Sequence, residues 1–342
     1  MGSLSKKGLA IVLAAFALLG GSPAFAESTQ ALSGHDKMVA FSNEFNDKEI
    51  KTLYYDLVNS KAAMKKLGQS GQRLLEQFYN AYKDKDFENA NKCIRELIQI
   101  HEGRKHKNLV DILRIFRMFA YMSLADYDRT IADAETDIAH DSADPFAYAV
   151  RIRALFLKAY QYSPDCKSKE MTYALDELDK GIGFCVPEQV MLYHYGAAQI
   201  RAERDEYPQA LEHANALVAM APNNAVALEL RADCWAGMDK DFRKMRGHSE
   251  RAGIQVSDWR IEDGKERAIE DLTAAIEIKD SFDCRVKRAG LEKEIYEFED
   301  AWADIKVARR MAKTDDDKAD VMLEVLSLRK QEKDASEGEE QE

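Results

Sequence analysis

Proline and glycine are both scarce in this chain, which has only 6 prolines and 17 glycines among 342 residues. Both residue types interrupt helices, so their scarcity favours long helical segments. No run of alternating apolar and polar residues lasts long enough to predict a β-strand. With 46% hydrophobic and 32% charged residues, the chain can bury a large core beneath a charged surface. The composition therefore predicts an all-α fold.

Cysteines are also few, and their number is odd. The five are Cys93, Cys166, Cys185, Cys234 and Cys284. The sequence has neither a CxxC motif nor the dense spacing of a small disulfide-stapled domain. One or two bridges, or none, are compatible with this pattern. We expect no bridge between Cys166 and Cys185, because the predicted helix between them would be about 24 Å long and would hold them at opposite ends.

Basic residues are outnumbered, since 49 Lys and Arg face 61 Asp and Glu and give a formal net charge of −12. An acidic protein is a poor candidate for binding nucleic acid or an anionic membrane surface. We therefore expect a protein or peptide partner rather than either of these.

The first 26 residues have the pattern of a secretory signal. Lys6 and Lys7 precede an apolar stretch from Leu9 to Leu19, and Ala24-Phe25-Ala26 forms a small-x-small cleavage site. The apolar stretch is shorter than the roughly 20 residues of a permanent membrane span. We expect cleavage after Ala26, a periplasmic or secreted mature protein, and no membrane span after cleavage. An uncleaved anchor is the alternative.

No catalytic, cofactor or metal-binding motif is recognisable. His101 and His106 lie in HEGRKH, one residue too far apart for the zinc motif HExxH, and residues at i and i+5 lie about 140° apart around a helix. We interpret this stretch as a solvated loop. His194 and His213 occupy positions compatible with helix packing. The expectation is no catalytic residue, no metal and no cofactor, with a metal-dependent module or other enzyme on a helical repeat as the competing class.

The most informative stretch, residues 205–231, reads DEYPQALEHANALVAMAPNNAVALELR. Apolar residues at helical spacing lead to Pro222-Asn223-Asn224, which ends one helix and provides a cap for the next. The stretch resembles the second helix of a tetratricopeptide repeat followed by the first helix of another. Ala210 and Pro222 match the family pattern, whereas Leu217 departs from its second small position.

Similar segments recur six times. Four are 34 residues long, at 71–104, 111–144, 191–224 and 282–315, and two more begin at Pro145 and Ala225. In the second, Thr130 and Asp137 replace the usual alanines. Six weak matches in series are strong evidence for a repeat protein. The resemblance implies a right-handed α-solenoid of about six helical hairpins over residues 71–315, with insertions near 158–168 and 239–262.

The ends of the chain lie outside these repeats. We expect a loose mature N-terminus at 27–45 and an N-terminal capping helix at 46–68. A C-terminal capping helix is predicted at 316–330, followed by an acidic disordered tail at 331–342.

The resemblance implies a concave groove lined by the first helix of each pair, in which a peptide or a partner helix binds. By position, the groove residues are Leu75, Tyr79, Tyr82, Ile115, Phe119, Met122, Phe146, Arg153, Phe156, Tyr195 and Gln199. The alternative for each is ordinary packing between neighbouring helices.

The two insertions offer a second candidate patch, because both fall in the turn between the helices of a pair. Its aromatic and basic residues are Tyr160, Tyr162, Phe242, Arg243, Lys244, Arg246, Arg251 and Trp259. The alternative is a tolerated surface loop. The predicted role is an exported scaffold or adaptor for assembling an envelope complex, and a self-associating structural spacer is a further alternative. The sequence specifies neither the partner nor the oligomeric state.

Overall fold

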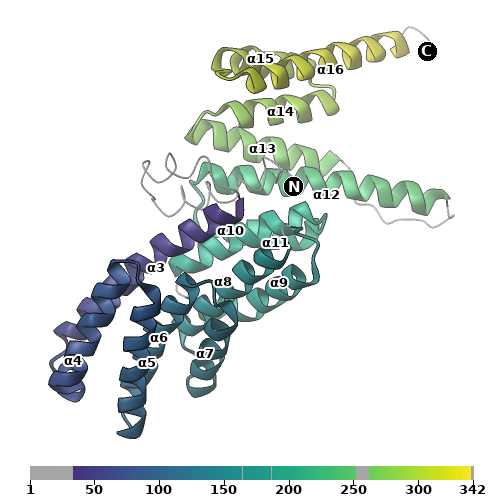
Figure 1. The fold of residues 1–342 in the computed structure, drawn as a ribbon. Coiled ribbons are helices and arrows are strands. Elements are labelled where there is room, and N and C mark those ends of the chain that lie inside the picture. Colours follow the sequence, from purple (N-terminus) through teal and green to yellow (C-terminus); the bar gives the residue numbers. More distant parts are fainter. Residues whose placement is uncertain (1–33, 164, 186, 252–261, 340–342) are drawn as a thin grey trace. The chain divides into compact units, whose positions relative to one another are not determined.

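The computed structural model describes residues 34–163, 165–185, 187–251 and 262–339, and every regular element in these ranges is a helix (Figure 1). In chain order the helices are α3 (Gly34–Asn59), α4 (Lys61–Lys83), α5 (Phe87–Gly103), α6 (Lys107–Ser123), α7 (Tyr127–His140), α8 (Pro145–Tyr162), α9 (Lys169–Gly181), the short 3₁₀ helix η1 (Ile182–Phe184), α10 (Pro187–Glu203), α11 (Tyr207–Met220), α12 (Ala225–Arg251), α13 (Glu262–Ile278), α14 (Phe282–Glu294), α15 (Phe298–Met311) and α16 (Asp315–Glu339). None of the described helices is both long and apolar enough to cross a lipid bilayer.

The chain divides into two compact units, residues 1–193 and 194–342. In the first unit, each helix from α4 to α9 packs against the one before it and the one after it. The same order of packing runs from α11 to α16 in the second unit. The predicted all-α solenoid of consecutive helical hairpins is confirmed.

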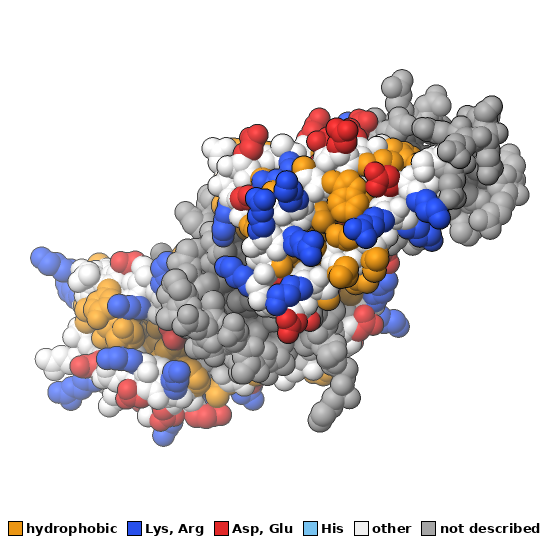
Figure 2. Space-filling model, turned by 90° about the horizontal axis from the view of Figure 1, so that it is seen from above, with side chains coloured by type: hydrophobic (Ala, Val, Ile, Leu, Met, Phe, Trp, Pro, Cys, Tyr) orange, Lys and Arg blue, Asp and Glu red, His pale blue; other side chains and the backbone are white. Residues whose placement is uncertain are grey.

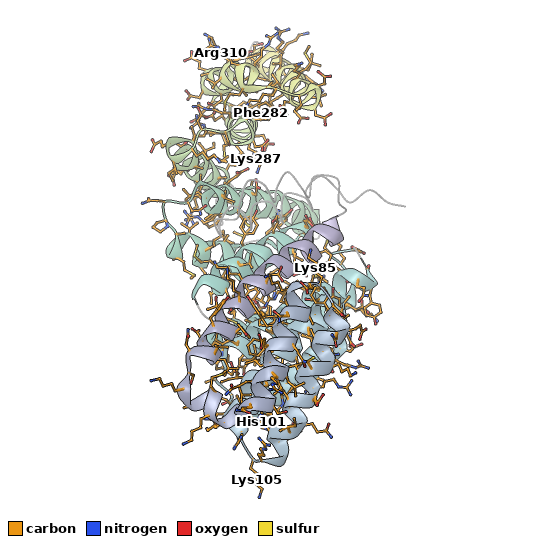
Figure 3. All side chains as sticks on the ribbon, turned by 60° about the vertical axis from the view of Figure 1, so that its left-hand side comes forward. Lys85, His101, Lys105, Phe282, Lys287 and Arg310 are labelled. Atoms are coloured by element: carbon orange, nitrogen blue, oxygen red, sulfur yellow. The ribbon has the colours of Figure 1, made fainter. Side chains whose placement is uncertain are left out.

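One turn recurs between these helices. Five non-glycine residues adopt left-handed backbone angles: Lys85, Lys105, Ala125, Asp205 and Tyr296. After each, the next amide donates to a carbonyl five residues back, as in Asp86 N to Ala81 O at 2.8 Å. This is a Schellman-type helix end, which satisfies carbonyls that the helix leaves unpaired. Figure 3 labels two of these residues, Lys85 and Lys105.

Small side chains allow the two helices of each hairpin to approach closely. Six residues at corresponding positions of the second helices are completely buried: Ala90, Thr130, Ala174, Ala210, Ala268 and Ala301. A larger side chain there would push the paired helices apart. The in-phase small residues of the sequence therefore mark the hairpin contacts.

The ends and the second insertion differ from the sequence-based expectation. Helix α3 begins at Gly34, so residues 34–45 are helical rather than loose, and it ends at Asn59. A separate helix then starts after Ser60, whose hydroxyl accepts from the Ala63 amide. Helix α12 continues through 239–251, so the first half of that insertion extends a helix instead of forming a turn. Helix α16 continues to Glu339, well into the predicted disordered tail.

Candidate functional site

Most groove residues predicted in the first unit are buried. Six of them are at most 8% exposed: Leu75, Tyr82, Ile115, Phe119, Met122 and Phe156. Tyr79, Phe146 and Arg153 are partly exposed. Helices α4, α6 and α8, the first helices of three consecutive hairpins, carry all nine. The structure thus brings these residues together on one set of helices, while their binding role stays a prediction.

Helix α3 lies against this same set of helices. It contacts α4, α6 and α8, and Figure 1 shows it running along them in purple. Ile50 and Leu57 of α3 are buried in the core that contains Phe119 and Met122. The sequence suggested that this helix shields the open end of the stack. It lies instead across the first helices of three hairpins.

Aromatic contacts fix one end of this helix. The ring of Tyr54 on α3 stacks on that of Tyr79 on α4, with centroids 3.9 Å apart and planes 7° from parallel. Tyr55 meets both rings edge-on and remains 48% exposed. Stacked and edge-on pairs of this kind contribute about 0.5–1.5 kcal/mol each beyond simple burial.

Charged groups of α3 also lie near the predicted groove residues. Burial raises the pKa of Glu49, an effect partly opposed by the positive charge of Arg153 on α8. Burial lowers the pKa of Arg153 itself. Asp47 lies near the Tyr82 hydroxyl, which is 3.0 Å from Ser123 Oγ. The predicted groove residues thus lie beneath a helix that brings acidic side chains near Arg153, whose Nε and Nη2 atoms are buried.

In the second unit, Tyr195 and Gln199 of α10 are the remaining predicted groove residues. Tyr195 is 4% exposed and lies within electrostatic range of Glu229, Asp233 and Lys287. Lys287 Nζ binds Glu229 Oε1 at 2.7 Å and Asp233 Oδ2 at 2.8 Å. This part of the surface is polar, in contrast to the first unit.

The second candidate patch is only partly visible. Tyr160 and Tyr162 end helix α8, and Tyr162 is 65% exposed. Phe242, Arg243, Lys244, Arg246 and Arg251 lie on the extension of α12, where only the backbone is described, and Trp259 lies outside the described residues. The proposed patch therefore stays a prediction.

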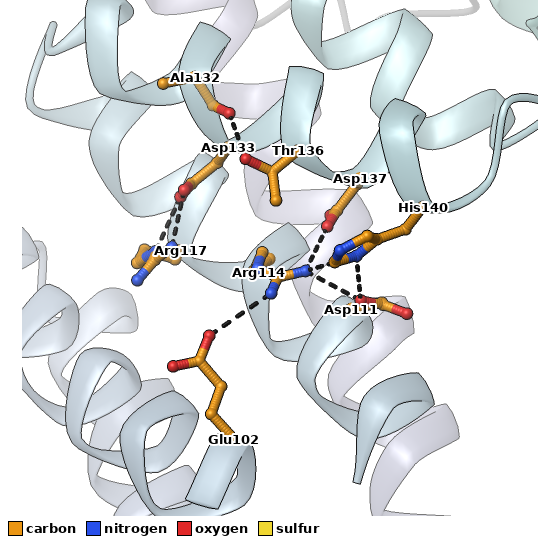
Figure 4. Close-up of polar contacts among 9 residues, drawn as sticks. All are labelled: Glu102, Asp111, Arg114, Arg117, Ala132, Asp133, Thr136, Asp137 and His140. Carbon is orange, nitrogen blue, oxygen red and sulfur yellow. Dashed lines mark hydrogen bonds and ion pairs between the residues drawn. The ribbon is translucent and has the colours of Figure 1, made fainter. Parts of the chain in front are cut away.

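A buried ionic cluster surrounds Arg114 in the second hairpin (Figure 4). Arg114 Nη1 lies 2.9 Å from Asp111 Oδ1, 2.9 Å from Asp137 Oδ1 and 3.2 Å from His140 Nδ1. Burial raises the pKa of Asp137 to about 6 despite the neighbouring guanidinium. Asp111, Asp137 and His140 are the one set of three potential metal ligands within the described chain, but the arginine already supplies their cation. The sequence signal for this cluster was Asp137, which occupies a position where the repeat pattern usually has a small residue.

Two histidine pairs come together as well. His101 Nδ1 lies 3.1 Å from His106 Nδ1, and His194 Nδ1 lies 2.9 Å from His213 Nδ1. His101 is completely buried, so the expectation of a solvated HEGRKH loop is wrong for this residue. The helix ends at Gly103 and the chain reverses, which brings together two rings that a continuous helix would separate.

Comparisons with known proteins give structural likeness only. No family model and no curated protein sequence matches the chain. A tetratricopeptide repeat protein from Parabacteroides merdae is 16% identical, with 75% of this chain and 100% of that one covered at a TM-score of 0.33. The TPR2AB domain of yeast Sti1, in complex with pHSP90, is 15% identical, with 76% and 97% covered at a TM-score of 0.32. A thermophilic TPR protein of Thermus thermophilus is 14% identical, with 75% and 98% covered at a TM-score of 0.27.

These scores are too low to support an argument about this chain, so the assignment depends on its own helices. They form consecutive hairpins joined by a recurring turn, with a small buried residue in phase in every second helix. The chain has the fold of a tetratricopeptide repeat protein.

Proposed function

We propose that this protein is an exported scaffold whose first unit binds an amphipathic helix of a partner protein, in assembling an envelope complex. The single observation that carries the proposal is the position of α3. A helix of this chain already lies across α4, α6 and α8, with Ile50 and Leu57 as its buried anchors. Binding a helix by its apolar stripe is a common mode of recognition in hydrophobic grooves.

The residues of the proposed groove indicate which side chains the partner helix would carry. Its floor takes aliphatic side chains spaced one or two turns apart, and the Tyr79 ring takes an aromatic side chain. Arg153 favours an acidic residue one position before the first anchor, where α3 carries Glu49. A partner with this pattern would replace α3. Export and the envelope location belong to the proposal and are based on the signal-like residues 1–26.

A labelled peptide of residues 44–59 tests the groove. Wild-type protein should not bind it, because α3 occupies the site. The full chain with Ile50→Asp should bind it, since an aspartate at a position 1% exposed weakens the docking of α3. Thr52→Asp is the matched control, because Thr52 is exposed on the same helix. Fluorescence anisotropy measures binding, and circular dichroism verifies that each variant is folded.

Two further results bear on the same proposal. Tyr79→Ala added to the Ile50→Asp chain should weaken peptide binding by roughly tenfold, which corresponds to the loss of one aromatic stack. If the folded Ile50→Asp chain does not bind the peptide at all, α3 is a fixed part of the core and the proposal is wrong. Stoichiometric metal in purified protein would instead favour the metal-dependent alternative.

A further inference from the structure

Helix α16 is held to the second unit by one of its faces. Val321 and Leu328 are at most 4% exposed and pack in a core with residues of α15. The two polar residues between them are both engaged, because Lys293 Nζ of α14 contacts Glu324 Oε1 and Ser327 Oγ. The apolar and polar side chains on the inner face of this segment thus all have partners on α14 and α15.

The opposite face of the same segment is also apolar. Met322, Leu323 and Leu326 are 57%, 66% and 56% exposed, and exposed Ala319 extends them at spacings of three, four and seven residues. We call these four residues the outer stripe. Figure 2, a view from above, shows hydrophobic side chains exposed among Lys, Arg, Asp and Glu. No described helix packs on the stripe. A terminal helix that faced only water would be polar here, and one that is apolar on both faces is normally covered.

The charges at the two ends of the stripe have opposite signs. Residues 315–320 contain four aspartates and one lysine, a net charge of −3. Residues 329–333 contain Arg329, Lys330 and Lys333 against Glu332, a net charge of +2. Neither Arg329 nor Lys330 has an ion pair within the described chain. The helix is therefore acidic before the stripe and basic after it.

We propose that a second copy of this chain covers the outer stripe with its own α16, in an antiparallel arrangement about a two-fold axis. A two-fold interface needs a surface that is complementary to itself. Antiparallel packing meets this need, since it joins the two stripes and places each acidic end beside the partner's basic end. It also opposes the two helix dipoles favourably. Parallel packing would instead place the two acidic ends, each with a net charge of −3, beside one another. The 19 residues from 315 to 333 span about 27 Å of helix, sufficient for the two stripes to pair along their whole length.

Sedimentation equilibrium of the full chain from about 1 to 100 μM tests the proposal. We expect a wild-type dimer, and a dissociation constant raised at least about 100-fold by Leu323→Asp with Leu326→Asp, because central apolar anchors dominate interfaces. Tyr173→Asp with Ile278→Asp is the control, since it removes two exposed apolar side chains elsewhere and should leave the dimer unchanged. A monomeric wild type, or a dimer that tolerates the two leucine changes, would overturn the proposal. Folding should be retained because both leucines are mainly exposed.

Charge exchange tests the antiparallel direction. Asp316→Lys with Asp320→Lys, or Arg329→Asp with Lys330→Asp, should each weaken the dimer by roughly tenfold at low salt. All four changes in one chain restore opposite charges in the antiparallel dimer and should restore its affinity. Parallel packing predicts no such rescue, so a four-residue variant that stays weak would contradict the arrangement.

Discussion

Replacing Arg114 by methionine tests whether its guanidinium is the cation that the cluster of Asp111, Asp137 and His140 requires. Arg114 is 9% exposed at its side chain, and Asp137 is only 2% exposed. Removing one partner of a buried ion pair leaves the other charged and desolvated, which costs about 3–5 kcal/mol. We expect Arg114→Met to lower the free energy of unfolding by about that amount at pH 8.

The loss should depend on pH, with a sign fixed by Asp137. Its pKa in the folded protein is raised from 3.8 to about 6, and loss of the guanidinium raises it further. A carboxyl with a raised folded pKa binds protons more tightly in the folded state than in the unfolded state. The penalty is therefore complete above the folded pKa and disappears as the pH falls toward 3.8. Between pH 8 and pH 5, the cost of Arg114→Met relative to the wild type should decrease by about 1.4 kcal/mol for each unit by which the substitution raises the folded pKa of Asp137 above its wild-type value.

Urea unfolding at pH 8 and pH 5, followed by circular dichroism, measures both effects. Arg117→Met is the matched control, because the side chains of Arg117 and Asp133 are more exposed, at 19% and 13%, and its cost should be smaller than that of Arg114→Met. Adding Asp137→Ala to Arg114→Met removes the buried charge and restores the usual small residue, so it should recover most of the loss. Equal costs for Arg114→Met and Arg117→Met, with no change between the two pH values, would refute this reasoning.

Two other perturbations have clear expected outcomes. Burial and the neighbouring His106 lower the pKa of His101, so the folded protein should lose stability as the pH falls below about 6.5. His101→Asn should make this loss smaller, which a comparison of melting temperatures at pH 7.5 and pH 5 would measure. An alanine at Gly237 would place its Cβ 2.0 Å from the Tyr207 ring. Gly237→Ala should therefore destabilise the second unit by about 1–3 kcal/mol, whereas Gly290→Ala, which meets nothing closer than 3.8 Å, should be neutral or stabilising in thermal denaturation.

The hairpins were predictable because their signals are local. An acidic residue followed by an aromatic residue begins the second helix at Asp86-Phe87, Asp126-Tyr127, Glu206-Tyr207 and Glu297-Phe298. The Asp86 and Asp126 side chains cap the helices that they precede. Each signal lies within a few residues of the helix end that it determines. The helices could therefore be predicted from local sequence, without knowing which helices pack together.

The candidate site was less predictable, because its covering helix is remote in sequence. The spacing of Ile50, Tyr54 and Leu57 predicts an amphipathic helix but does not specify what its apolar face contacts. Phe119 lies more than 60 residues away along the chain, in the same core as Ile50. Only the folded arrangement of α4, α6 and α8 reveals a surface long enough for α3. The prediction of groove residues from the repeat pattern alone therefore did not include the helix that covers them.

Helix α16 is a second case in which the sequence predicts a helix but not what its apolar faces contact. The sequence groups Val321, Met322, Val325, Leu326 and Leu328 as one amphipathic segment, which suggests a cap with one apolar face. At 100° per residue, Val321 and Leu328 are almost in line, while Leu326 points to the opposite side. Their exposed fractions agree, at 4%, 1% and 56%. Because α14 and α15 cover only one of these sides, a second apolar side is present whose partner cannot be another described helix of the same unit. In the proposed dimer, the partner's α16 supplies at this end the burial that a neighbouring hairpin supplies inside a solenoid.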